Sequence, residues 1–169
     1  MNYISQMDRN KLFESKLQTH LEQTGLKIWN KEQIVYSYSQ PESDIQINYI
    51  SHMINVNNIF ICFQTKITDN SVSVSDFVNF ANCVNYISSF HNTIAIGIYI
   101  SNKSLCNPCK IKLENENNKY TNGESLSYFY NISELNEFVL LSRIHNFLHQ
   151  TFDIYMYDTE GDCIMGYTY

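Results

Sequence analysis

The sequence predicts an α/β protein with three layers, in which helices flank a mixed sheet of four or five strands. Segments with apolar residues at helical spacing alternate along the chain with segments rich in aromatic and β-branched residues. The 169 residues, 44% of them hydrophobic, can form one packed core. We therefore expect one main domain over residues 1–150, with residues 151–169 as a C-terminal hairpin packed on it.

Residues 8–25 are expected to form the first helix, because an apolar stripe at helical spacing ends in Gly25. Residues 44–50 alternate between polar and apolar side chains and predict a strand. A polar turn over residues 55–58 should then return the chain as a hairpin. The second strand of this hairpin, residues 59–67, is aromatic and β-branched up to its polar end, which is typical of a buried central strand.

The remaining elements follow the same alternation. We expect a helix over residues 75–91, strands over 93–102 and 126–130, and a helix over 133–149 capped by Ser133. The last helix should pack on the sheet through Leu135, Phe138, Val139, Leu141 and Ile144. Residues 114–121 are asparagine-rich and predict an exposed connection. Residues 153–157 and 163–169 predict a terminal β-hairpin that covers a sheet edge or mediates self-association.

The polar end of the buried strand carries the main functional signal. Gln64 and Lys66 are two residues apart and should project from the same face, whereas Phe63, Thr65 and Ile67 should project from the other. The predicted hairpin would place Asp44 beside Gln64 and Lys66. A carboxylate and an amide oxygen suit Mg²⁺, and a neighbouring lysine can orient or deprotonate an attacking water.

This order of segments resembles the restriction-endonuclease-like PD-(D/E)XK superfamily, and within it the Mrr-like branch, whose third motif often reads Gln-x-Lys. The resemblance covers roughly residues 8–150. It implies metal-dependent endonuclease cleavage of DNA phosphodiester bonds. By this resemblance, Asp44 and Gln64 would bind Mg²⁺ or Mn²⁺, Lys66 would act at the attacking water, and Glu14 would be the helix-borne accessory acid.

The chain departs from the family pattern in its second motif. No Pro-Asp pair is present, because Pro41 lies three residues before Asp44, and Gln64 supplies no negative charge. Each candidate also has an ordinary explanation: Asp44 as a turn residue, Glu14 as an exposed helix residue, and Gln64 with Lys66 as a strand end emerging into solvent. A catalytically inactive nuclease-fold subunit that binds nucleic acid, or a protein-interaction domain, is therefore the alternative function.

The net charge of −6 argues against a general nucleic-acid coating protein. The acidic excess lies in the C-terminal third, because residues 1–113 carry eight acidic and nine basic side chains, whereas residues 114–169 carry nine acidic and two basic ones. Ser101, Lys103, Lys110 and Lys112 follow the strand ending near residue 100 and are the candidates for contact with DNA, although such lysines are equally typical of solvated surface.

The number of cysteines, five, is odd, and Cys62 and Cys83 lie on predicted core elements, which argues against a disulfide framework. Cys106 and Cys109 have the spacing of a metal or redox pair, but zinc would need a second pair. A redox pair would open a helix after a strand, and the surrounding polar residues favour a loop instead.

The polar N-terminus and the lack of a long apolar run indicate a soluble protein with no membrane partner. We expect it to be intracellular, cytoplasmic or nuclear, and not secreted. DNA is the expected partner. Many members of the superfamily that the chain resembles have a separate recognition domain, and here a homodimer or a separate recognition subunit would take its place.

Overall fold

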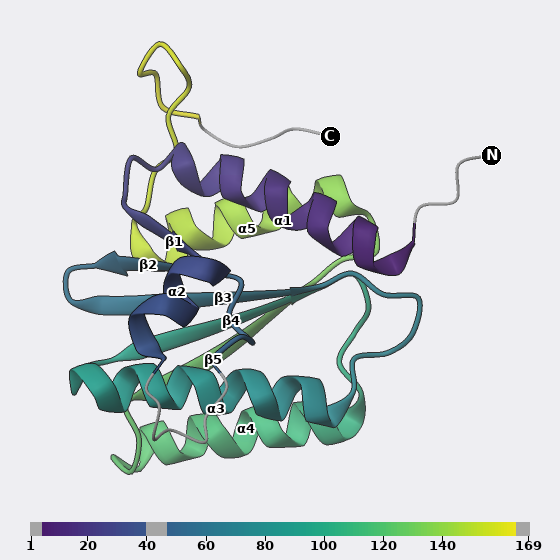
Figure 1. Ribbon diagram of the computed structural model, residues 1–169, viewed down its shortest axis with the longest axis vertical. Coiled ribbons are helices and arrows are strands. Elements are labelled where there is room, and N and C mark those ends of the chain that lie inside the picture. The colour runs from purple at the N-terminus through teal and green to yellow at the C-terminus, as the bar shows by residue number, and fades with distance from the viewer. Residues whose placement is uncertain (1–4, 40–46, 165–169) are drawn as a thin grey trace.

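The computed structural model describes residues 5–39 and 47–164, which form three layers of helix, sheet and helix (Figure 1). The helices are α1 (Gln6–Glu22), α2 (Lys31–Tyr38), α3 (Val74–His91), α4 (Asn107–Thr121) and α5 (Glu137–Phe152). The strands are β1 (Ile28–Asn30), β2 (His52–Val56), β3 (Ile59–Lys66), β4 (Ala95–Ser101) and β5 (Ser127–Ser133). The predicted α/β class with a mixed sheet is confirmed.

The five strands lie in the sheet in the order in which they occur along the chain. The pairs β1 with β2 and β2 with β3 are antiparallel, whereas β3 with β4 and β4 with β5 are parallel. Helices α3 and α4 are the crossovers between the parallel strands. The strands β3, β4 and β5 therefore end at one edge of the sheet, which we call the carboxyl edge, and both α3 and α4 begin there.

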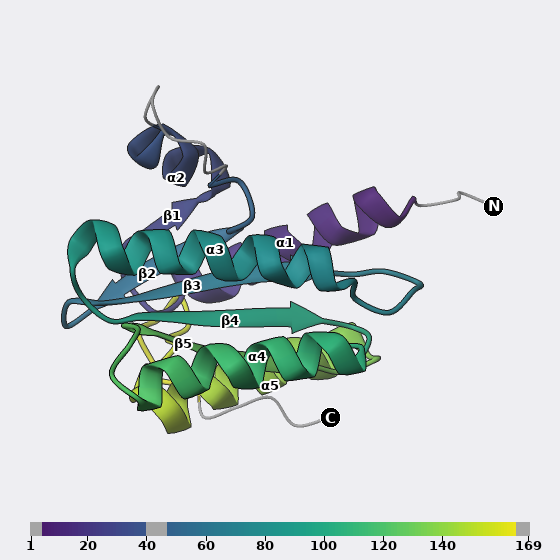
Figure 2. The ribbon, with the colours of Figure 1, turned by 90° about the horizontal axis from the view of Figure 1, so that it is seen from below.

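Two hydrophobic clusters separate the layers. Figure 1 shows α1 and α5 on one face of the sheet and α3 with α4 on the other, and in Figure 2 the last two run along the strands on that second face. Strand β3 contributes to both clusters, with Ile61 and Phe63 facing α1 and α5, and Phe60 and Cys62 facing α3. The predicted alternation along this central strand is confirmed, because neighbouring strand residues point to opposite faces.

The hairpin between β2 and β3 turns at Asn57 and Asn58, which both have positive φ, 52° and 67°. Two consecutive left-handed residues are what a tight two-residue hairpin requires, and asparagine tolerates that conformation. The predicted turn is therefore correct.

The predicted strand over residues 44–50 is wrong in its described part, because Ile47–Ile50 form a turn and the strand is His52–Val56 instead. The tight turn fixes the pairing, and His52 already lies opposite Phe63 near the end of β3. Ile47 and Ile50 are buried in the cluster on the α3 face, so their apolar character reflects packing of a loop.

Helix α4 contradicts two predictions, the loop over residues 106–109 and the exposed connection over residues 114–121. Its buried face is narrow and contains Cys109 and Glu116, so the sequence shows no apolar stripe. The Asn117 side chain donates to the carbonyl of Phe129 (2.9 Å) and accepts from its N–H (2.8 Å). An asparagine in a polar run thus satisfies backbone groups of the terminal strand β5.

The last helix begins later than predicted. Strand β5 continues to Ser133, and Asn136, not Ser133, caps α5 by accepting from the N–H groups of Phe138 and Val139. Leu135 and Phe138 are largely exposed, whereas Leu140, Leu141, Ile144 and Leu148 form the buried face. The predicted stripe is therefore correct for Leu141 and Ile144 and wrong for Leu135 and Phe138, which lie before or at the start of the helix.

The described part of the C-terminal segment packs on the main domain. Ile154 and Met156 are buried in the cluster beneath α1 and α5, and the N–H of Tyr157 donates to the carbonyl of Gln23. A single antiparallel bridge joins Tyr157 to Cys163, so the predicted hairpin is reduced to one pair there. None of the described helices is long and apolar enough to cross a membrane.

Candidate site at the carboxyl end of the central strand

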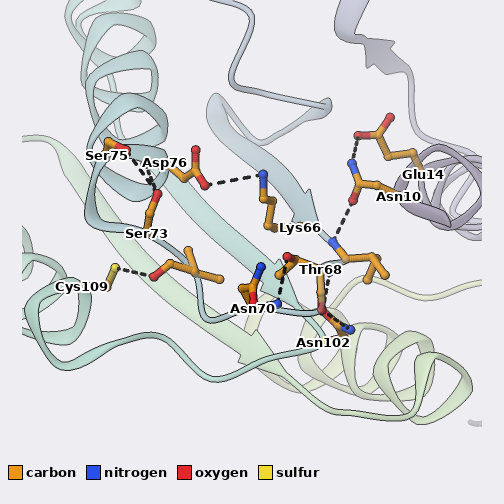
Figure 3. Close-up of polar contacts among 12 residues, drawn as sticks. Asn10, Glu14, Lys66, Thr68, Asn70, Ser73, Ser75, Asp76, Asn102 and Cys109 are labelled. Carbon is orange, nitrogen blue, oxygen red and sulfur yellow. Dashed lines mark hydrogen bonds and ion pairs between the residues drawn. The ribbon is translucent and has the colours of Figure 1, made fainter. Parts of the chain in front are cut away.

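The polar residues that end the parallel strands meet at the carboxyl edge. Lys66 of β3 lies opposite Ser101 of β4, which in turn lies opposite Ser133 of β5. The chain leaves β3 and β4 through a reciprocal pair of hydrogen bonds, in which Asn102 accepts from the N–H of Thr68 (2.9 Å) and donates to its carbonyl (3.0 Å). This buried clamp holds the exits of the two central strands together (Figure 3).

Gln64 and Lys66 share the strand face of Phe60 and Cys62, as predicted from their spacing, and the structure shows that this face is turned toward α3. The ammonium of Lys66 lies 3.5 Å from a carboxylate oxygen of Asp76, with the two side chains 40% and 36% exposed (Figure 3). Asp76 stands in the first turn of α3, where its N–H donates to the capping hydroxyl of Ser73. The helix start therefore fixes the carboxylate that holds the lysine.

Gln64 carries an unusual polar atom. Its side-chain oxygen Oε1 is fully buried and has no hydrogen-bond partner among the residues that the structure describes. Buried side-chain oxygens are nearly always paired, and an unpaired one indicates a site for a water or an ion. The oxygen predicted as a metal ligand is therefore buried without a donor from the described residues.

Glu14 lies on the opposite face of β3. One of its carboxylate oxygens accepts from the hydroxyl of Thr65 (3.1 Å) and from the amide of Asn10 (3.2 Å). Asn10 also accepts from the N–H of Ile67 (2.9 Å), which ties α1 to the end of the strand (Figure 3). The structure thus places Glu14 against Thr65 and away from the face that carries Gln64 and Lys66.

A cleft of about 570 Å³ lies on this α1 side and is lined by Glu14, His52, Lys11, Lys31 and other polar side chains. His52 is buried, and burial lowers its pKa to about 4, with a smaller contribution from the charge of Lys31. The imidazole is therefore neutral near pH 7.

The candidate DNA-contacting residues occupy different environments. Ser101 is fully buried and donates to the carbonyl of Lys103 (2.6 Å), so its hydroxyl is occupied by the chain itself. Lys110 is exposed in the first turn of α4. Lys112 pairs with the buried Glu116 (3.0 Å), whose pKa is lowered by this lysine, Asn85 and Lys119 against the opposing effect of burial. Ser101 and Lys112 are thus engaged within the protein, and Lys103 and Lys110 remain the candidates of this set.

Asp44 lies outside the described residues. Within residues 5–39 and 47–164, no group of three or more His, Cys, Asp or Glu side chains could hold a metal ion. Of the two predicted metal ligands, Asp44 and Gln64, the structure therefore describes only Gln64.

Asp76 is the residue of this site that sequence reasoning missed. The spacing of Ser73 and Asp76, with a serine three residues before an acid at the start of a helix, is a recognisable capping pattern. It locates the carboxylate in the first turn of α3, but its approach to Lys66 depends on how α3 packs on the sheet.

Comparison of the chain with family profiles, curated proteins and solved structures gives no significant match.

Proposed function

We propose that the protein is a Mg²⁺- or Mn²⁺-dependent endonuclease that hydrolyses DNA phosphodiester bonds at the carboxyl end of β3. Gln64 and Asp44 hold the cation, and Lys66 acts at the attacking water and the phosphate. When bound, the cation supplies positive charge to the phosphate and helps position water. The family resemblance of the sequence and the local structure around β3 both support this assignment.

The unpaired oxygen of Gln64 carries the proposal. A strand end that merely emerges into solvent would leave this amide hydrated, whereas its oxygen is buried without a donor. Keeping a buried acceptor unpaired costs roughly 1–3 kcal/mol. A cation ligand offers a reason for a protein to retain such a group, because carboxylate and amide oxygens are the ligands that Mg²⁺ prefers.

Lys66 is placed to serve the same centre. It shares the strand face of Gln64, and its ammonium is partly exposed and held by one carboxylate, Asp76. Pairing with Asp76 fixes the direction of a long, flexible side chain while leaving part of it accessible. We assign Asp76 as a positioning residue that orients Lys66 toward the phosphate.

Glu14 receives a different role from the one that the resemblance implies. Its carboxylate is engaged by Thr65 and Asn10 on the α1 face, so we assign it to anchoring α1 against the end of β3. This contact holds the end of β3 from its α1 face, opposite the face that carries Gln64 and Lys66.

DNA would approach the carboxyl edge, where α3 and α4 both begin. Helix N-termini carry partial positive charge and favour phosphate groups. Lys103 and Lys110 lie beside the start of α4 and add full positive charges there. The acidic C-terminal third does not prevent this approach, because these cations precede residue 114.

The decisive test is cleavage of plasmid and short single-stranded DNA with Mg²⁺ or Mn²⁺, comparing the wild type with Lys66→Ala. We expect metal-dependent cleavage that falls by about 10²-fold or more in the variant. Lys119→Ala is the matched control, because this lysine lies in the last turn of α4, far along the helix from the carboxyl edge, and pairs with Glu116.

Equal cleavage by the wild type and Lys66→Ala would show that the activity does not arise at this site. If neither protein cuts and metal binding is undetectable by calorimetry, the chain is a non-catalytic subunit of the same fold.

A further inference from the structure

Two cysteines open helix α4. Cys106 is the N-terminal capping residue, and Cys109 lies in the first turn. Their sulfur atoms are 3.0 Å apart, about 1 Å more than the length of a disulfide bond. Both residues are free thiols. The intervening Pro108 suits the first turn of a helix, since it has no N–H to leave unpaired there.

The two thiols differ in their access to solvent. Cys106 is partly exposed, and the two residues between the cysteines, Asn107 and Pro108, are both exposed. Cys109 is fully buried and donates to the carbonyl of Val72 (3.4 Å; Figure 3). A reagent in solution can therefore reach the first sulfur and not the second.

The more accessible thiol, Cys106, is also the more acidic of the two. The side-chain hydrogen bond that Cys106 shares with Cys109 lowers the pKa of Cys106. Burial raises the pKa of Cys109 to about 12. The N-terminus of a helix further favours a thiolate at its capping position. Near neutral pH, the exposed thiol is thus the better nucleophile.

We propose that Cys106 and Cys109 form a redox-active dithiol that reduces disulfides by thiol–disulfide exchange, with Cys106 as the attacking sulfur and Cys109 as the resolving sulfur. This site is separate in its chemistry from the proposed nuclease centre. Its substrate class is an accessible disulfide, either of low molecular weight or on another protein.

The reaction has two steps. The thiolate of Cys106 attacks one sulfur of a disulfide R–S–S–R, forming a mixed disulfide and releasing R–S⁻, which takes up a proton from water. Cys109 then loses its proton to water, and its sulfur attacks the sulfur of Cys106, forming the Cys106–Cys109 disulfide and releasing the second R–S⁻. Two protein thiols are oxidised, and one disulfide is reduced to two thiols.

The other cysteines lack this arrangement. Cys62 and Cys83 are buried in the core, and burial raises the pKa of each thiol. Cys163 is exposed near the C-terminal end of the described chain and lies beyond α5. Exposure alone would make Cys163 react with a disulfide, but only the pair in α4 couples an accessible sulfur to a buried one.

The test uses the whole 169-residue chain with Cys163→Ser, so that the exposed cysteine outside the pair cannot contribute. The reduced protein is equilibrated with mixtures of oxidised and reduced glutathione, quenched with acid and N-ethylmaleimide, and analysed by peptide mass spectrometry. We expect an intramolecular Cys106–Cys109 disulfide that is reversed by excess reduced glutathione.

Two further variants in that background identify the roles of the sulfurs. Cys109→Ser should accumulate a glutathione adduct on Cys106, and Cys106→Ser should react with oxidised glutathione at least about 10-fold more slowly than the parent. Because a variant at the buried position could unfold, the parent is also alkylated with iodoacetamide between pH 6 and 8. Cys106 should react faster than Cys109 throughout.

The proposal fails if glutathione mixtures that oxidise a model dithiol leave Cys106 and Cys109 reduced. It also fails if Cys109 is alkylated as fast as Cys106 in the folded parent. Neither result depends on DNA or on a divalent cation, so the outcome is independent of the proposed nuclease activity.

Discussion

The two faces of β3 differ sharply at its polar end. On the α1 face, the hydroxyl of Thr65 and the carboxylate of Glu14 satisfy each other, and Asn10 bonds both the carboxylate and the backbone. On the α3 face, two residues of the same strand leave a buried oxygen unpaired on Gln64 and a partly exposed ammonium on Lys66. One face is built for stability, whereas the other retains groups that a ligand could use.

This difference shows why adjacent polar residues in a strand should be judged separately. Neighbouring residues point into different layers, so Thr65 can serve the fold while Gln64 and Lys66 serve chemistry. A functional site tolerates unfavourable groups for the sake of activity, and replacing them should not lower stability. The following substitutions test the comparison, beginning with the largest expected effect.

Replacing Gln64 should have opposite effects on cleavage and on stability. We expect Gln64→Leu to lower metal-dependent cleavage by about 10-fold to 100-fold, as is usual for substitutions at metal sites, and to raise the free energy of unfolding by about 1 kcal/mol. Cleavage assays and urea denaturation measure the two quantities on the same preparation. A clear loss of stability would mean that the amide is a structural group.

On the α1 face, His52 should make the free energy of unfolding depend on pH. Because the pKa of His52 is about 4 in the folded protein and about 6.5 in an unfolded chain, its contribution to stability is present above pH 6.5 and is lost as the pH falls toward 4. Between pH 7.5 and 4.5, the wild type should lose about 2 kcal/mol more than His52→Gln.

Urea denaturation at the two pH values gives this difference directly. The charged residues that line the cleft around His52, which are Lys11, Glu14, Lys31 and Glu32, are present in both proteins, so the difference between the two losses isolates His52. Equal losses in the two proteins would show that His52 is already accessible to protons in the folded state.

Thr65→Val should cost about 1 kcal/mol of stability, because it removes one donor from Glu14 in a part-buried contact. Cleavage should be nearly unchanged as long as the protein is folded. The measurement is thermal denaturation alongside the cleavage assay, with Gln64→Leu as the opposite case. An effect on cleavage as large as that of Gln64→Leu would show that the two faces act as one site.

The smallest effect is expected for the ion pair. Asp76→Asn should change the free energy of unfolding by less than about 1 kcal/mol, since both partners of the Lys66–Asp76 pair are more than a third exposed and screened by water. Urea denaturation at low and high salt measures it. A larger, salt-independent loss would indicate a structural lysine and would weaken its assignment to catalysis.

The sequence predicted the parts of the fold that carry strong hydrophobic patterns. Strand β3, helix α3 and strand β4 are buried on both faces or along a wide stripe, so their apolar spacing is unambiguous. Helices α2 and α4 were not predicted, because α2 is short and α4 is mostly polar. Helix α2 begins with a capping box between Asn30 and Gln33, and α4 is held by contacts such as that of Asn117 with β5, and the hydrophobic pattern shows neither.

For the candidate site, the sequence predicted which residues of one strand share a face, but not which residues of different elements are in contact. The common face of Gln64 and Lys66 follows from strand geometry alone. The side from which Glu14 approaches depends on the packing of α1, and the contact of Asp76 with Lys66 depends on the packing of α3. The pairing of Cys106 with Cys109 was hidden by polar neighbours that made the helix start resemble a loop.

The bonds from Asn117 to Phe129 also bear on assembly. They occupy outward-pointing backbone groups in the middle of β5, the terminal strand on that side, so a further strand cannot dock there without displacing the asparagine. At the other side, β1 is only three residues long. Within the described residues, addition of a further strand is thus obstructed at β5, and β1 offers only a short strand for pairing.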